Sequence, residues 1–205
     1  MELFVVVVVI CLLAIIFISL PNHNMKTRAL RIQCVNNLKE VGLAYGVWEG
    51  DHGGHYPMTI SETNGGTMEF NIGPNAWRHF QMLSNELTMP KVLICPADWR
   101  LRATNFAFLA NSNISFFVGV DASETNPQGI LSGDHNITNG TPVKNGILEL
   151  STNQTTGWTA EMHNKVGNIG LADGSVQPVS IAGLRSAVEN AGVPTNHLQM
   201  PVLSP

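Results

Sequence analysis

Few side chains in this sequence have both the type and the spacing to carry out chemistry. His163 precedes an Asp173-Gly174 pair with nine residues between them. Histidine and aspartate serve as acid–base groups and metal ligands, so this pair is the first candidate for a site. However, residues 168–172 between them read as a strand, which at about 3.3 Å per residue would separate the two by roughly 17 Å. We therefore interpret His163 as a turn residue and Asp173-Gly174 as a hairpin turn.

Two cysteines, Cys34 and Cys95, lie far apart in the sequence. Neither belongs to a Cys-x-x-Cys pair or has a histidine at zinc-finger spacing, which argues against a metal site. Outside the cytoplasm such a pair can form a disulfide, and otherwise both are reduced core residues. The sequence leaves these two alternatives open. Cys11 lies within an apolar run and is interpreted as a small buried hydrophobe.

Other polar segments are weaker candidates. Residues 51–55 and 133–136 each combine aspartate with histidine, and both are interpreted as solvated turns in preference to metal sites. Asp121, Glu124 and Asp134 can supply oxygen ligands to calcium, but without EF-hand spacing this is the less favoured alternative. The sequence contains no nucleotide-binding, zinc-protease or serine-hydrolase motif. We therefore expect a protein that is not an enzyme and that carries no cofactor.

The charge distribution argues against a nucleic-acid partner. The chain has 11 Lys and Arg residues and 15 Asp and Glu residues, for a net charge of −4. The basic residues are scattered, whereas phosphate binding needs a concentrated basic face. Lys26, Arg28 and Arg31 form the one basic cluster, directly after an apolar segment, where they can touch lipid headgroups.

The elements that must position these residues begin with that apolar segment. Residues 3–20 contain no charged residue, proline or glycine. As a helix they would span roughly 27 Å, close to the hydrocarbon thickness of a bilayer. A cleaved signal peptide has a basic start and a small-residue cleavage site, whereas this segment follows the acidic Glu2. The sequence therefore predicts a permanent membrane anchor over residues 1–24.

A second helix is expected over residues 26–48. Apolar residues recur there at helical spacing and define one face: Leu30, Cys34, Leu38, Val41, Tyr45 and Trp48. Pro21 is expected to kink or break the chain without ending the helical structure, so residues 25–50 continue the anchor as one long helix. Residues 51–54, Asp-His-Gly-Gly, are expected to end it.

The remainder of the chain changes to strand periodicity. A short helix is expected at 75–87 with Asn75 as its cap, a buried strand at 92–95, and a helical turn or two at 183–191 followed by a loose tail. Six runs typical of strands are expected at 114–120, 128–132, 146–150, 158–162, 168–172 and 176–180. The predicted fold is α+β: residues 25–205 form one head, whose antiparallel sheet packs on the amphipathic helix while its other face can be solvated.

Four segments of the chain resemble, in order, motifs of one protein family. The segments are Glu2 before an apolar helix, residues 31–39 (RIQCVNNLK), residues 95–98 (CPAD), and His163 with Asp173-Gly174. They are similar to the glutamate of the prepilin-type helix, a CxNNLKQ segment, a CPxD segment and a C-terminal H-X9-DG signature. Pilin-like proteins abundant in planctomycetes, verrucomicrobia and their relatives carry these motifs, and the resemblance covers most of the chain.

The resemblance implies a lollipop-shaped pilin or pseudopilin, with a long N-terminal helix packed on a β-sheet head. It implies a non-enzymatic subunit of a type II secretion or type IV pilus-like filament, held in the bacterial inner membrane by a single pass, with its head in the periplasm or on the cell surface. Glu2 would pair with the terminal amine of a neighbouring subunit. The expected partners are therefore membrane lipid and like subunits or other pilin-type proteins. A stand-alone membrane-anchored binding domain is the alternative.

The N-terminus departs from the family pattern. Family members begin with a short basic leader ending in glycine, after which a prepilin peptidase cuts, whereas this sequence begins at Met1-Glu2. The basic residues follow the apolar segment, which by the positive-inside rule would leave the head in the cytoplasm. A basic leader encoded upstream would reverse that orientation, and we favour this expectation over an unprocessed anchor.

Overall fold

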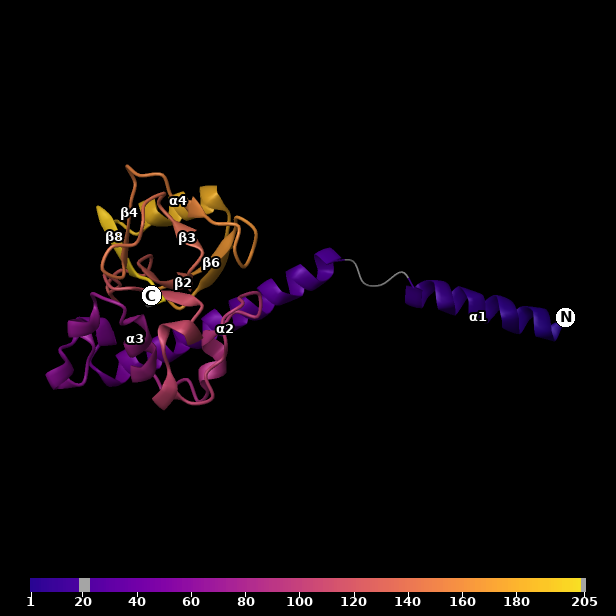
Figure 1. The fold of residues 1–205 in the computed structure, drawn as a ribbon, viewed down its shortest axis with the longest axis horizontal. Helices are drawn as coiled ribbons and strands as arrows, with labels where there is room; N and C mark the ends of the chain where they lie inside the picture. Colours follow the sequence, from indigo (N-terminus) through magenta and orange to yellow (C-terminus); the bar gives the residue numbers. More distant parts are fainter. Residues whose placement is uncertain (19–22, 204–205) are drawn as a thin grey trace.

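The computed structural model describes residues 1–18 and 23–203, with side chains described for residues 1–12 and 25–203. Two helices, α1 (Glu2–Ile18) and α2 (His23–Asp51), precede a head that is built first from loops and short helices and then from strands (Figure 1). The kink or break expected at Pro21, and with it the single long helix, lies outside the described residues. Among the described helices, none combines the length and the apolarity needed to cross a membrane.

Helix α2 confirms the helix predicted over residues 26–48. Most of its predicted apolar face is buried in the head, with exposed fractions of 0–3% for Cys34, Leu38, Val41, Tyr45 and Trp48. Steps of three and four residues put these side chains on one side of a helix, and the head covers that side. Helix α2 ends at Asp51. Gly53 and Gly54 follow with φ of 69° and 83°, a left-handed backbone that suits glycine after a helix.

A loop-rich segment connects α2 to the sheet. It contains one α-helix, α3 (Ala76–Met82), and six short 3-10 helices. These are η1 (Pro57–Thr59), η2 (Glu62–Asn64), η3 (Met68–Phe70), η4 (Pro90–Leu93), η5 (Phe106–Phe108) and η6 (Asn111–Asn113). Buried side chains of the segment, Phe80 and Leu93 among them, belong to the same hydrophobic core as the buried apolar face of α2.

A six-stranded antiparallel sheet forms the centre of the head, in the order β4-β8-β1-β2-β6-β7. The strands are β1 (Phe116–Gly119), β2 (Ile130–Asp134), β4 (Ile147–Ser151), β6 (Gly167–Leu171), β7 (Val176–Val179) and β8 (Thr195–Gln199). A second sheet pairs β3 (Ile137–Thr138) with β5 (Gly157–Trp158). The predicted α+β class with an antiparallel sheet is confirmed.

Both faces of the six-stranded sheet are covered at its central strands β1, β2 and β6, which are buried throughout, so the face that the sequence allowed to be solvated is occupied there. Phe116 packs into the core that contains α2, and its neighbour Phe117 packs into a second core that contains α4 (Ile181–Asn190). Successive residues of a strand point to opposite faces, so one strand can contribute to both cores. Helix α4 buries Leu184 and Val188 against the outer face. It begins two residues before the helical segment predicted at 183–191.

Four other elements differ from the prediction. Residues 92–95, expected as a strand, follow the start of η4, where Pro90 occupies the first turn and its fixed φ favours a helical start. The helix expected over 75–87 is the shorter α3, and the side chain of Asn75 forms no capping bond. The expected loose tail contains β8, which pairs with both β4 and β1. The strand predicted at 158–162 is limited to the short β5.

Candidate functional site

Three of the four motif-bearing segments meet in the interior of the head. Cys34 of α2, Cys95 after η4 and His163 before β6 place their sulfur and ring-nitrogen atoms within 4.8 Å of one another. Cys95 Sγ lies 3.3 Å from His163 Nε2. Asp134, the last residue of β2, joins them, with Oδ1 3.1 Å from Cys34 Sγ and Oδ2 3.5 Å from His163 Nε2. These four residues are called the cysteine–histidine–aspartate cluster below.

Each member of the cluster is placed by a different element. Cys34 points inward because it belongs to the buried stripe of α2. Pairing of β2 with β1 sets Asp134 opposite Phe116, near the edge where β2 ends. The amide of Cys95 donates to Ser115 Oγ over 2.9 Å, which fixes the backbone that carries this thiol.

The loop that carries His163 is held by an amide side chain. Asn136 Nδ2 donates to the carbonyl oxygens of Glu161 and Val166, at 3.0 and 3.1 Å. Met162 and Asn164, on either side of His163, have φ of 57° and 53°. Positive φ at non-glycine residues marks a tightly constrained turn. This turn carries the imidazole into the interior, where 4% of His163 is exposed.

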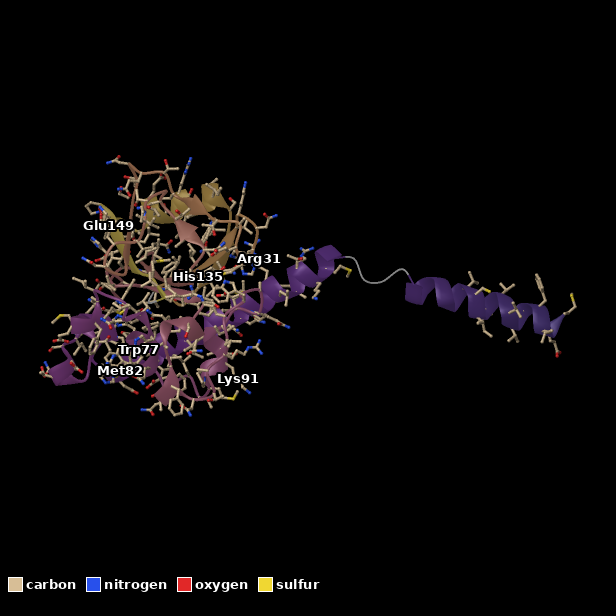
Figure 2. All side chains as sticks on the ribbon, viewed as in Figure 1. Arg31, Trp77, Met82, Lys91, His135 and Glu149 are labelled. Atoms are coloured by element: carbon tan, nitrogen blue, oxygen red, sulfur yellow. The ribbon has the colours of Figure 1, made fainter. Side chains whose placement is uncertain are left out.

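Hydrogen bonds from neighbouring residues support the carboxylate and join α2 to the head. Asn168 donates from its backbone N and from Nδ2 to Asp134 Oδ2, each over 2.8 Å. Arg31 of α2 donates to the carbonyl of Gly167 over 3.2 Å and to Asn168 Oδ1 over 3.5 Å. Figure 2 shows Arg31 where α2 meets the head. In the sequence, Arg31 belongs to a basic cluster that can touch lipid headgroups. In the structure its side chain contacts the head.

Asn37, in the motif segment over residues 31–39, also has a structural partner. Asn37 Nδ2, one turn of α2 beyond Cys34, donates to the carbonyl of Ile94 over 2.8 Å. This bond ties the residue immediately before Cys95 to α2. The motif segment over residues 31–39 therefore contributes one inward-facing thiol and two polar contacts that dock α2 on the head.

A second polar network lies beside the cluster, around the buried carboxylate of Asp98. Asp98 Oδ2 accepts from Ser115 Oγ over 2.7 Å and from His135 Nε2 over 2.9 Å. Arg100 Nε lies 3.7 Å from the same oxygen, and Nη1 of Arg100 donates to the carbonyls of Asn111, Ile114 and Pro201. Because Ser115 also accepts from the Cys95 amide, the CPAD segment is held at both of its ends. Figure 2 shows His135 within the head.

Burial and mutual contacts shift the protonation of the cluster. The four residues have exposed fractions of 0–4%, and burial raises the pKa of both Asp134 and Cys34. The hydrogen bond with Cys34 is the main cause that lowers the pKa of Cys95 to about 6. Burial alone would lower the pKa of His163, but the contacts with Cys95 and Asp134 raise it by more. Cys95 and His163 therefore favour a thiolate–imidazolium pair.

A thiolate beside an imidazole is also the arrangement of a cysteine nucleophile. Here Cys95 is 0% exposed and His163 is 4% exposed, so a substrate would reach the sulfur only if the head opened. Two sulfurs, a ring nitrogen and a carboxylate are instead a donor set suited to holding a metal ion. Both cysteines are free thiols in this structure, and the disulfide between them stays a sequence prediction.

The Asp173-Gly174 pair lies apart from the cluster, in the turn between β6 and β7. Asp173 Oδ1 accepts from the amide of Ser175 over 2.8 Å, and Gly174 has a φ of 80°, as expected for a hairpin turn. The turn also approaches α2, since a Cβ added at Gly42 would lie 3.8 Å from the carbonyl oxygen of Gly174. The interpretation of His163 as a turn residue is incomplete because its ring is buried in the cluster.

The carboxylates considered for calcium lie at different places in the head. Asp134, interpreted as part of a solvated turn at 133–136, is 0% exposed and forms the end of β2. Asp121 follows the opposite end of the β1–β2 pair and accepts from His197 through Oδ2. The carboxylates considered for calcium therefore do not converge. Glu2 begins α1 and is exposed.

Spacing in the sequence could not reveal the cluster, because its members come from four separate segments. The available signal was chemical: three of the four motif segments contain a cysteine or histidine, and the fourth member, Asp134, stands next to His135. Comparison with known proteins adds no relative, since no family model, curated protein or solved structure matches the chain.

Proposed function

We propose that this chain is a non-enzymatic, membrane-anchored subunit of a pilin-like or pseudopilin-like filament, of the type II secretion or type IV pilus kind. In this proposal the N-terminal helices of like subunits pack together, the anchor crosses the bacterial inner membrane once, and the head lies in the periplasm or on the cell surface. The observation that carries the proposal is an exposed apolar stripe on α2. It consists of Met25, Ile32, Leu43 and Val47, with exposed fractions of 59, 55, 68 and 48%.

The stripe lies on the face of α2 opposite to the face that the head covers. At about 100° per residue, its four side chains fall within about 60° of arc, and the buried Cys34 and Tyr45 lie on the other side. Polar residues such as Lys39 and Glu40 are interspersed, so the stripe is not a continuous core surface. An exposed row of large apolar side chains on a helix nevertheless indicates a surface that another element covers. The equivalent helices of neighbouring subunits are suited to that role.

Helix α1 supports the same arrangement. Its residues 3–10 are all large and apolar, and their exposed fractions lie between 40 and 81%. A helix that is apolar on every side needs lipid or other apolar helices around it, and the apolar run of the sequence continues to Leu20. Glu2 would then be a carboxylate at the edge of an apolar bundle. Such a charge requires a cationic partner, which the terminal amine of an adjacent subunit can supply.

The motif segments give a second line of support. Cys34 and Asn37 of α2 meet Cys95, the carbonyl of Ile94 and His163 in the interior. Residues from three of the four segments on which the family resemblance rests thus share one structural task, which is to fix α2 on the head. A filament subunit needs this junction to be rigid, because the helix transmits the packing of the bundle to the head.

Charged residues placed on the stripe test the proposal. Leu43→Glu combined with Val47→Glu should leave the head folded, because both side chains are exposed. It should also leave the chain in the carbonate-resistant membrane fraction. Chemical crosslinking in intact cells should yield a ladder of multiples of the 22.2 kDa wild-type chain and no ladder for the double variant. Ile72→Glu, a change at a 65% exposed isoleucine in the head, is the matched control and should crosslink as the wild type does.

Two results would contradict the proposal. A wild-type chain that remains monomeric in intact cells would make a stand-alone anchored binding domain the better account. A wild-type chain that carbonate releases from the membrane would contradict the anchor itself.

A further inference from the structure

We propose that the cysteine–histidine–aspartate cluster is a structural zinc site with Cys34, Cys95, His163 and Asp134 as its four ligands. Zinc in proteins prefers four ligands in a tetrahedron, drawn from cysteine sulfur, histidine nitrogen and carboxylate oxygen. The cluster offers two of the first kind and one each of the others. This proposal goes beyond the filament function and does not depend on it.

The distances within the cluster match a tetrahedral site. Zinc–sulfur bonds of about 2.3 Å and zinc–nitrogen or zinc–oxygen bonds of about 2.0–2.1 Å place neighbouring ligand atoms about 3.3–3.8 Å apart. Cys34, Cys95 and His163 place their ligand atoms within 4.8 Å of one another, and Cys95 Sγ lies 3.3 Å from His163 Nε2. Asp134 has Oδ1 3.1 Å from Cys34 Sγ and Oδ2 3.5 Å from His163 Nε2. A rotation of its side chain that brings Oδ1 toward the imidazole would therefore complete the set of four.

The residues around the cluster support the carboxylate ligand and supply a compensating charge. Both hydrogen bonds from Asn168 go to Oδ2 of Asp134, which leaves Oδ1 to bind the ion while the other oxygen is held in place. Hydrogen-bonded carboxylates of this kind are usual in metal sites. A zinc ion with two thiolates and one carboxylate has a net charge of about −1. The guanidinium of Arg31, bound to Asn168 and to the carbonyl of Gly167, supplies a nearby positive charge.

A closed site of this kind has a structural role. Four protein ligands leave no position for substrate or water, and all four residues have exposed fractions of 0–4%. The ion would link α2, the segment after η4, the end of β2 and the loop before β6. Binding forms two zinc–sulfur bonds and releases two protons to solvent, one from the thiol of Cys34 and one from the Cys95–His163 pair, with no change of oxidation state. The imidazole binds through Nε2, the ring nitrogen that lies 3.3 Å from Cys95 Sγ and 3.5 Å from Asp134 Oδ2.

Metal analysis of the full-length protein is the first test. The chain is purified in mild detergent without chelator, and we expect about one zinc ion per chain. Exchange for cobalt should give a near-ultraviolet thiolate-to-cobalt charge-transfer band and the visible bands of a tetrahedral site. Cys34→Ser and Cys95→Ser should remove the ion and both spectral features. Cys11→Ser is the matched control, because Cys11 is exposed and outside the cluster, and it should retain them.

Measurements on the wild type keep the proposal testable even where a variant fails to fold. A strong zinc chelator should lower Tm by about 5–10 °C, and zinc but not magnesium should restore it. After chelation and denaturation without reductant, all 3 cysteines should react with a thiol reagent. A folded wild-type chain that takes up neither zinc nor cobalt would overturn the site. A single reactive thiol would overturn it as well, because Cys34 and Cys95 would then be joined in a disulfide.

Discussion

The thiol of Cys34 donates a hydrogen bond of 3.1 Å to the carboxylate of Asp134, a residue 100 positions later in the chain. This contact joins the buried face of α2 to the end of β2. The other carboxylate oxygen accepts two hydrogen bonds from Asn168. A single buried carboxylate thus receives donors from both α2 and β6, and it forms the polar centre of the junction between helix and head.

Replacement of that carboxylate should weaken the head. Asp134→Ala would leave the donors of Cys34 and Asn168 buried without an acceptor, at a cost of about 1–3 kcal/mol for each unsatisfied group. We expect the free energy of unfolding to fall by about 3 kcal/mol or more. Urea unfolding in mild detergent, followed by the fluorescence of the buried Trp48 and Trp158, measures the change. Asp51→Ala, at the exposed end of α2, should change stability by less than about 0.5 kcal/mol. Equal effects of the two substitutions would contradict the assignment.

Acid should destabilise the head through His79. This residue is buried, accepts at Nδ1 from Thr67 over 2.7 Å and donates from Nε2 to Gln199 over 2.5 Å. Burial lowers the pKa of His79 to about 4. The unfolded chain therefore binds this proton more readily than the folded chain, and acid favours unfolding. Between pH 7.5 and pH 5 the free energy of unfolding should fall by about 2 kcal/mol from this residue alone.

A matched pair of variants isolates the contribution of His79. In His79→Gln the acid-dependent loss should shrink by about 2 kcal/mol over the same interval, although the variant is less stable than the wild type at neutral pH. His55→Gln changes an exposed histidine and should follow the wild-type pH dependence. An unchanged pH dependence in His79→Gln would show that the imidazole is not the group responsible.

Two glycines should respond in opposite directions to alanine. Gly146 has a φ of 78°, and an added Cβ would collide with the backbone carbonyl of Gly73. We expect Gly146→Ala to lower the free energy of unfolding by about 2–4 kcal/mol, because both the backbone and the packing oppose a side chain. Gly46 lies within α2 with no atom near an added Cβ. Gly46→Ala should raise stability by about 0.5–1 kcal/mol, since alanine favours the helix. Thermal unfolding compares the two, and a shift in the same direction would contradict the local geometry.

The long helical periodicity was the part of the fold that the sequence could predict most fully. The buried apolar face of α2, from Cys34 to Trp48, repeats over several turns. Such a helical pattern can be recognised without knowing which distant residues pack against it. Strand β8 was missed because Asn196 and Gln199 are polar, yet both are buried between neighbouring strands. Its place is set by backbone pairing with β1 and β4, which composition does not record.

The candidate site was less predictable than the fold. The cysteines, His163 and Asp134 each have side chains capable of chemistry, but their separation in the sequence conceals their convergence. Only the packing of α2 on the sheet brings Cys34 to Asp134, and only the turn around His163 directs its ring inward. His163 and Asp173 lie in different surroundings, because His163 contacts Cys95 whereas Asp173 accepts from Ser175 in the turn between β6 and β7.

The most direct measurement of the central claim is site-specific crosslinking of the α2 stripe in intact cells. Leu43→Cys is made in a Cys11→Ser background, so that the added thiol is exposed while Cys34 and Cys95 remain buried. A short bifunctional thiol reagent should then join neighbouring chains into dimers and higher multiples. Ile72→Cys in the same background should remain a monomer. Monomers alone from the Leu43 variant, or equal crosslinking at both positions, would contradict assembly through the N-terminal helices.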